Sequence, residues 1–238
     1  MRVYLENNIL ISIEDKKIEI ADLKKHFGSN TEFVYSYIHL QELLEAGTGF
    51  EALKDKRLES IRKIMQYKHI VPQFENLGNE FLILNEDPES VLSRLQPYQF
   101  INGELKGAVQ VVDNYRERLV QTLGIDIKRL NNYSVDEVVK QISNALNSNL
   151  YFDLKSLIDC MGLQLHAQIN SIFNILDMIG YWKDEKTERS NMTRVYDSSH
   201  TYFASGCNYF VSNDKRCRAK AKVAYHLKNI KTEVISWK

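Results

Sequence analysis

Short hydrophobic runs at both ends of the chain alternate with segments in which hydrophobic residues recur every three or four positions. The runs are rich in β-branched and aromatic residues, which favours strands, whereas the recurring positions favour helices. Strands are predicted at residues 3–5, 31–35, 209–211 and 232–236. Helices are predicted from Ile9, from Ser36, at 198–205 and at 215–227. Strands that alternate with helices predict a parallel sheet with helices on both faces, an α/β fold.

The middle of the chain, residues 51–190, has a different pattern, because long segments with helical periodicity dominate it. All three prolines fall within 70–99, where they predict an irregular connection. The charged run 183–194 predicts a loop that leads back to the sheet. The helical segments are 53–67, 109–124, 134–146 and 163–180. We therefore expect an α/β core formed by residues 1–50 and 191–238, and an all-helical insertion formed by residues 51–190.

Composition and charge exclude several classes of protein. The chain has 238 residues, and 31 Lys and Arg balance 31 Asp and Glu, so it is neither a histone-like basic protein nor an acidic disordered chain. Three cysteines without a CxxC pair do not make a disulfide framework. A zinc site formed by His200, Cys207, Cys217 and His226 matches no compact ligand spacing. No apolar run approaches the roughly 18 residues of a membrane span, so we expect a cytoplasmic protein without a membrane partner.

Four acidic residues share a position that ordinary surface carboxylates do not have. Glu6 and Asp214 each follow a predicted strand, and Glu42 lies in the helix after the second strand. Asp197 opens the helix that carries His200 one turn later. Ligand sites in parallel sheets form where the carboxyl ends of the strands meet. Clustered carboxylates favour Mg²⁺ or Mn²⁺ over zinc, so these residues predict a metal site.

For each residue taken singly, a structural role is the alternative. A carboxylate at a helix N-terminus interacts favourably with the helix dipole, as Asp197 would. His200 either orients a phosphate or a carboxylate, or pairs with its neighbour on an exposed helix face.

The charges of the chain are unevenly distributed. Residues 215–231 contain no acid, so the rest of this neutral chain carries the compensating negative charge. Lys215, Arg218 and Lys222 lie on one helical face, where they would bind a phosphate backbone; a solvated face that balances charge is the alternative. The basic residues are Lys215, Arg216, Arg218, Lys220, Lys222, Lys228 and Lys231.

Three segments, YLENNIL, YSYIHLQELLEA and DSSHTYFASGCNYFVSNDKR, together resemble the PIN domain, the metal-dependent ribonuclease fold of many prokaryotic toxins and RNA-processing nucleases. The resemblance implies that the four acidic residues of the family correspond to Glu6, Glu42, Asp197 and Asp214, which would be both the metal ligands and the catalytic residues. It also implies supporting roles for small polar side chains beside them, which are Asn8, Ser36 and Ser212.

The function implied is an Mg²⁺- or Mn²⁺-dependent endonuclease that hydrolyses phosphodiester bonds, with RNA as the substrate. The family also implies an antitoxin-like or other protein partner, and homo-oligomers are compatible with it. Glu6 stands where the family usually has Asp, and Asn208 where it often has another acid. The alternative is therefore a catalytically degenerate PIN-like module that binds nucleic acid or protein. An aspartyl-phosphate phosphatase is a weaker alternative, because the segment Glu6-Asn7-Asn8 supplies no nucleophile.

Overall fold

The computed structural model describes residues 1–73, 79–96, 127–150, 153–183 and 188–237. The chain forms two compact units, and each is described by itself. The first unit contains residues 1–101, 200–215 and 231–238, and the second contains residues 102–199 and 216–230. Two of the four boundaries between the units fall inside helices, between Ser199 and His200 and between Lys215 and Arg216.

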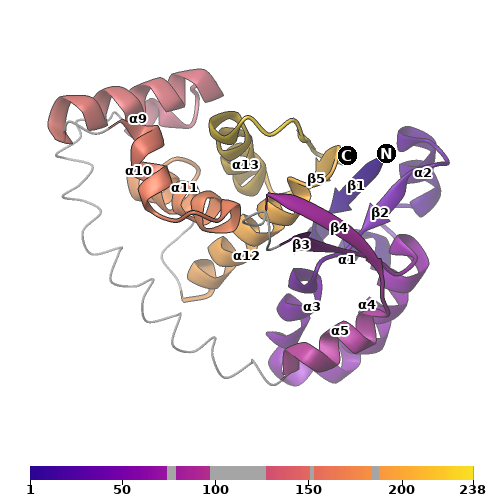
Figure 1. Cartoon of the computed structure of the whole chain (residues 1–238). Coiled ribbons are helices and arrows are strands. Elements are labelled where there is room, and N and C mark those ends of the chain that lie inside the picture. The colour runs from indigo at the N-terminus through magenta and orange to yellow at the C-terminus, as the bar shows by residue number, and fades with distance from the viewer. Residues whose placement is uncertain (74–78, 97–126, 151–152, 184–187, 238) are drawn as a thin grey trace. The chain divides into compact units, whose positions relative to one another are not determined.

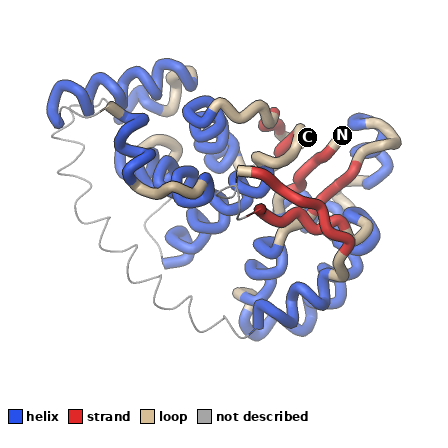
Figure 2. Tube along the Cα trace, viewed as in Figure 1, coloured by secondary structure: helices blue, strands red, loops and turns tan. Residues whose placement is uncertain are grey.

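A four-stranded parallel sheet lies at the centre of the first unit, in the order β2-β1-β5-β6 (Figures 1 and 2). Val3 of β1 lies opposite Phe33 of β2 on one side and Tyr209 of β5 on the other. All four strands were predicted at these positions, and the parallel α/β class is confirmed. The strands are β1 (Arg2–Leu5), β2 (Glu32–Val34), β5 (Tyr209–Val211) and β6 (Glu233–Ile235).

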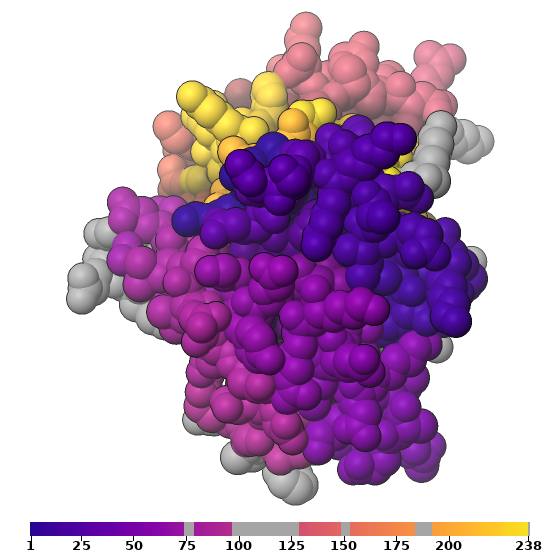
Figure 3. Space-filling model, turned by 90° about the vertical axis from the view of Figure 1, so that its right-hand side faces the viewer, coloured from indigo at the N-terminus to yellow at the C-terminus, as the bar shows by residue number. Residues whose placement is uncertain are grey.

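Helices cover this sheet and bury a hydrophobic core that includes Leu5, Ile9 and Leu40. A capping box formed by Ser36 and His39 begins α3, as the sequence predicted for Ser36. In the space-filling view, the indigo-to-magenta residues of this unit form a continuous surface (Figure 3). The helices are α1 (Asn7–Glu14), α2 (Ile20–Phe27), α3 (Tyr37–Leu44), α4 (Phe50–Met65) and α5 (Pro88–Leu95), with a short 3-10 helix at Gly47–Gly49.

An antiparallel hairpin of β3 (Lys68–Gln73) and β4 (Glu80–Asn85) also belongs to the first unit. The predictions of an irregular connection at 70–99 and of an all-helical middle segment are therefore wrong. Pro72 lies within β3, beyond the backbone bonds that join this strand to Tyr35, so its missing amide hydrogen breaks neither of them. Pro88 is the first residue of α5, a position at which proline is favoured, and Pro97 lies outside the described residues.

The described part of the second unit is helical. Its core contains Ile142, Ile172 and Leu176. The predicted helices at 134–146 and 163–180 are confirmed, and the one at 109–124 lies outside the described residues. Because α12 already begins at Glu188, the predicted loop at 183–194 is wrong over its second half. The helices are α8 (Ile127–Leu130), α9 (Val135–Leu150), α10 (Leu154–Cys160), α11 (Leu165–Ile179), most of α12 (Glu188–Ala204) and most of α13 (Lys215–Lys228).

A buried ion-pair cluster joins three helices of this unit. The carboxylate of Asp177 on α11 forms an ion pair with each of two cations. Its Oδ1 lies 2.6 Å from Lys220 Nζ of α13, and its Oδ2 lies 3.2 Å from Arg194 Nε of α12. Lys220 is fully buried, with its ammonium group over the ring of Phe173. Lys220 therefore has a structural role and is not part of an exposed basic face, which corrects the sequence-based grouping of the charges. Within the described residues, no helix is both long and apolar enough to cross a membrane.

Candidate acidic site

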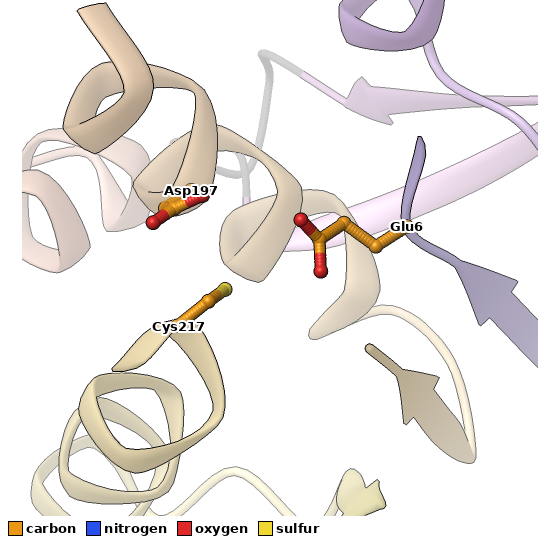
Figure 4. Close-up of side chains that lie close together, drawn as sticks. All are labelled: Glu6, Asp197 and Cys217. Carbon is orange, nitrogen blue, oxygen red and sulfur yellow. The ribbon is translucent and has the colours of Figure 1, made fainter. Parts of the chain in front are cut away.

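Glu6 lies directly after β1, at the carboxyl edge of the sheet (Figure 4). Its backbone N–H donates to Val211 O at 3.0 Å, which extends the pairing of β1 and β5 by one bond. The residue is only 7% exposed, and Asn8 Nδ2 donates to its Oε2 at 2.8 Å. The fold therefore places a carboxyl group in a largely dry position.

Burial raises the pKa of Glu6 to about 7. The charge of His200 and a hydrogen bond with Ser212 favour the ionised form, whereas the charges of Glu42 and Asp214 raise the pKa further. Glu42 and Asp214 thus each lie within electrostatic range of Glu6. A cation among them would relieve both the burial cost and the mutual repulsion.

The carboxylate of Glu42, on α3, is held at both oxygens. Asn7 Nδ2 donates to Oε2 at 2.5 Å, and His200 Nε2 donates to Oε1 at 2.8 Å. Burial alone would raise the pKa of Glu42, but His200, Asn7 and Arg57 outweigh it and lower the pKa below its ordinary value. Glu42 is therefore ionised at neutral pH, the state that a metal ligand requires.

Asn8 and Ser212 connect the ends of β1 and β5. Asn8 Nδ2 lies 3.4 Å from Ser212 Oγ, and Asn8 Oδ1 accepts from the backbone N–H of Asn213 at 3.1 Å. Ser212 Oγ also accepts from the backbone N–H of Asp214 at 3.0 Å. These two predicted supporting residues therefore fix the positions of Glu6 and Asp214.

Ser36, the third predicted supporting residue, contacts the buried tyrosine Tyr4. Its Oγ lies 2.7 Å from Tyr4 Oη. Tyr4 Oη in turn lies 2.7 Å from His200 Nδ1. Both ring nitrogens of His200 therefore have hydrogen-bond partners. A zinc site would need one of them, so the zinc alternative loses its first ligand.

Asp197, the fourth predicted acid, belongs to the second unit, three residues before His200 on α12. The prediction that it opens this helix is wrong, because α12 already begins at Glu188. It is 4% exposed, and its carboxylate and the thiol of Cys217 on α13 lie within 4.8 Å of each other (Figure 4). Its membership of the same metal site stays a prediction.

Two residues that hold the candidate site together were not predicted, Asn7 and Arg57. Arg57 of α4 is buried, donates from Nη1 to Asn7 Oδ1 at 2.9 Å and forms an ion pair with Glu14, with Nε and Oε1 2.6 Å apart. The arginine thereby fixes the amide of Asn7 so that its Nδ2 faces Glu42. The position of Asn7 directly after Glu6 could have indicated a role beside the acids. The sequence around Arg57 shows only the pattern of an ordinary charged helix.

The basic residues predicted to bind substrate lie on α13. Lys215 and Lys222 are exposed, and Arg218 is half-buried. Their common helical face is a consequence of their spacing.

The arrangement of the acids suits a hard divalent cation. Glu6, Glu42 and Asp214 offer carboxylate oxygens, the ligands that Mg²⁺ and Mn²⁺ prefer. We compared the chain with protein-family models, curated proteins and solved structures, and none of them matches it.

Proposed function

We propose that the chain is a PIN-like endoribonuclease that depends on Mg²⁺ or Mn²⁺. The observation that carries the proposal is the position of Glu6 directly after β1, at the carboxyl edge of a parallel sheet, with the charges of Glu42 and Asp214 within electrostatic range of it. Parallel sheets bind ligands at this edge. The order of the three sequence segments that resemble the family supports it further. Asp197 is proposed as the fourth acid on the strength of that resemblance.

Glu6, Glu42, Asp197 and Asp214 would hold the metal. When bound, the metal would supply Lewis acidity and an activated water for in-line attack on a phosphodiester. The protein's own contribution is to keep the acids in place. Asn7 and His200 keep Glu42 ionised, while Asn8 and Ser212 hold the neighbouring carboxyl of Glu6.

RNA binding is proposed for the exposed side of α13. Lys215, Arg218 and Lys222 would contact the phosphates that flank the scissile bond, because phosphate contacts position a nucleic acid without reading its sequence. The buried Lys220 is excluded from this surface.

The test is cleavage of a mixed RNA pool with Mg²⁺, with Mn²⁺ and with EDTA. Cleavage is expected only with a metal, and Glu42→Gln and Asp197→Asn should abolish it while the protein stays folded. Glu59→Gln, an exposed residue of α4, is the matched control and should cleave like the parent. Equal cleavage by Asp197→Asn would assign the activity to other residues or to a contaminant.

A second candidate is a degenerate PIN-like module that binds RNA without cleaving it. The longer side chain of Glu6, in place of the usual aspartate, favours this candidate, because Mg²⁺ tolerates displaced ligands poorly. A parent protein that binds RNA and does not cut it, together with a Glu6→Asp variant that does, would support this second function over the first.

A further inference from the structure

A chain of buried side chains runs behind the acidic site and links three segments of the first unit. It begins at Ser36, passes through Tyr4 of β1 and His200 of α12, and ends at Glu42. Each of its three contacts is 2.7 or 2.8 Å long. Ser36, Tyr4 and His200 are all completely buried.

The chemistry of the groups sets the direction of these hydrogen bonds. An ionised carboxylate can only accept, so His200 Nε2 carries a hydrogen and donates it to Glu42. When the ring is neutral, its Nδ1 accepts the hydrogen of the Tyr4 hydroxyl, and the Ser36 hydroxyl donates to Tyr4 Oη. Burial raises the pKa of Tyr4 well above its ordinary value, so the hydroxyl keeps its hydrogen.

The surroundings of Ser36 agree with this direction. Its backbone N–H donates to His39 Nδ1 at 3.1 Å, so that nitrogen carries no hydrogen. His39 Nε2 consequently donates to the backbone oxygen of Leu5 at 2.8 Å. His39 therefore supports the backbone just before Glu6. Of these two histidines, only His200 forms a hydrogen bond with a carboxylate.

We propose that Tyr4 and His200 are positioning residues of the metal site, which hold Glu42 Oε1 while Asn7 holds Oε2. The inference rests on the proposed function, because it assigns a role toward the same metal. Each carboxylate oxygen has a second lone pair, so the two hydrogen bonds leave Glu42 able to bind a cation. A carboxylate that is clamped in this way cannot rotate away from its ligand position.

Tyr4 and His200 are completely buried, so a positioning role through Glu42 fits them better than direct contact with a substrate. Removing the Tyr4 hydroxyl would leave its ring contacts with His39 and Phe210 in place, at centroid distances of 5.0 and 6.0 Å. Outer partners of metal ligands typically contribute 10- to 100-fold to metal affinity. The Tyr4→Phe variant therefore tests the effect of the hydroxyl on metal affinity without removing the packing of the ring in the core.

The experiment is calorimetric titration with Mn²⁺ alone. Tyr4→Phe should weaken binding about 10-fold and His200→Leu about 100-fold, the ends of the range for such partners. His200→Gln keeps an N–H donor and should recover part of the loss. The matched control is Tyr35→Phe, because Tyr35 is equally buried and its hydroxyl donates to the backbone oxygen of Glu86. It should bind Mn²⁺ like the parent.

Two outcomes separate this proposal from the function on which it rests. If the parent binds Mn²⁺ and Tyr4→Phe and His200→Gln bind it equally well, the positioning role is overturned and the metal site stands. If the parent binds no Mn²⁺, the metal site and the role of the two residues fail together. Nitrogen NMR of His200 in the metal-free protein is a second readout: a hydrogen on Nδ1 instead of Nε2 would overturn the proposed direction of the chain. Neither readout depends on His200→Leu, because the titration also uses Tyr4→Phe and His200→Gln, and the NMR measurement uses the parent protein.

Discussion

The fold changes the ionisation of Glu6, because burial raises the pKa of its carboxyl group to about 7. In the unfolded chain the same group titrates near its ordinary value of 4.5. Below that pH both states are protonated. As the pH rises toward 7, the unfolded state loses the proton first, so the folded protein loses stability until the folded state is also ionised.

Glu6→Gln should therefore equal the parent in stability at low pH and exceed it above pH 7. A pKa raised from 4.5 to about 7 corresponds to roughly 3 kcal/mol at 1.36 kcal/mol per unit. Urea unfolding in EDTA at several pH values measures the difference, with Glu59→Gln as the exposed control. Parallel stability curves for Glu6→Gln and the parent across this range would contradict the burial argument.

The residues of the candidate site differ in whether the sequence alone could point to them. Glu6, Glu42 and Asp214 could be chosen as candidates because strand ends and helix starts are local patterns, and because parallel strands bring their carboxyl ends together. Asn7 and Arg57 were not, because their roles depend on a contact between α1 and α4 that no local pattern encodes. A polar residue beside an acid carries no signal of which way its amide faces.

At the scale of elements, the hairpin of β3 and β4 shows why prolines misled the prediction. Proline usually interrupts a ladder, but Pro72 lies beyond the bonds to Tyr35, and Pro88 begins a helix. The early start of α12 was missed because residues 183–194 are polar, and polarity alone does not separate a loop from a solvated helix.

The three helices α11, α12 and α13 should depend on the cluster of Asp177, Arg194 and Lys220. Lys220→Ala leaves a buried carboxylate with one cation fewer, so the free energy of unfolding should fall by about 3 to 5 kcal/mol. Lys222→Ala, an exposed position on the same helix, should change it by less than about 0.5 kcal/mol. Chemical denaturation of both variants checks this expectation, and equal stabilities would refute it.

The exposed face of α13 gives a prediction about RNA. A Lys215→Ala/Arg218→Ala double variant should bind all RNA sequences more weakly, because phosphate contacts carry no base information. The log–log dependence of affinity on salt should flatten by roughly 0.7 for each lost contact with a single strand. Filter binding at several salt concentrations measures both effects. An unchanged slope in the folded variant would mean that this face only balances charge.

At the scale of the whole molecule, a bound metal should stabilise the folded protein, because the site requires the folded sheet. At a Mn²⁺ concentration 100 times the dissociation constant, the gain is about 2.7 kcal/mol. A thermal shift that EDTA reverses is expected for the parent and not for Glu42→Gln. Stabilisation of equal size in that variant would place the metal elsewhere.

The position of β1 in the sheet also has a consequence for synthesis on the ribosome. Its partner on one side, β2, follows soon after, but its partner on the other side, β5, comes about 200 residues later, since Val3 pairs with Tyr209. At roughly 5 to 20 residues per second, translation leaves that side of β1 without its partner for about 10 to 40 s. A nascent chain cannot assemble Glu6 with Asp214 during this interval. Its hydrophobic strand would meanwhile be exposed to chaperones, and the proposed nuclease would stay inactive until β5 and Asp214 had been synthesised.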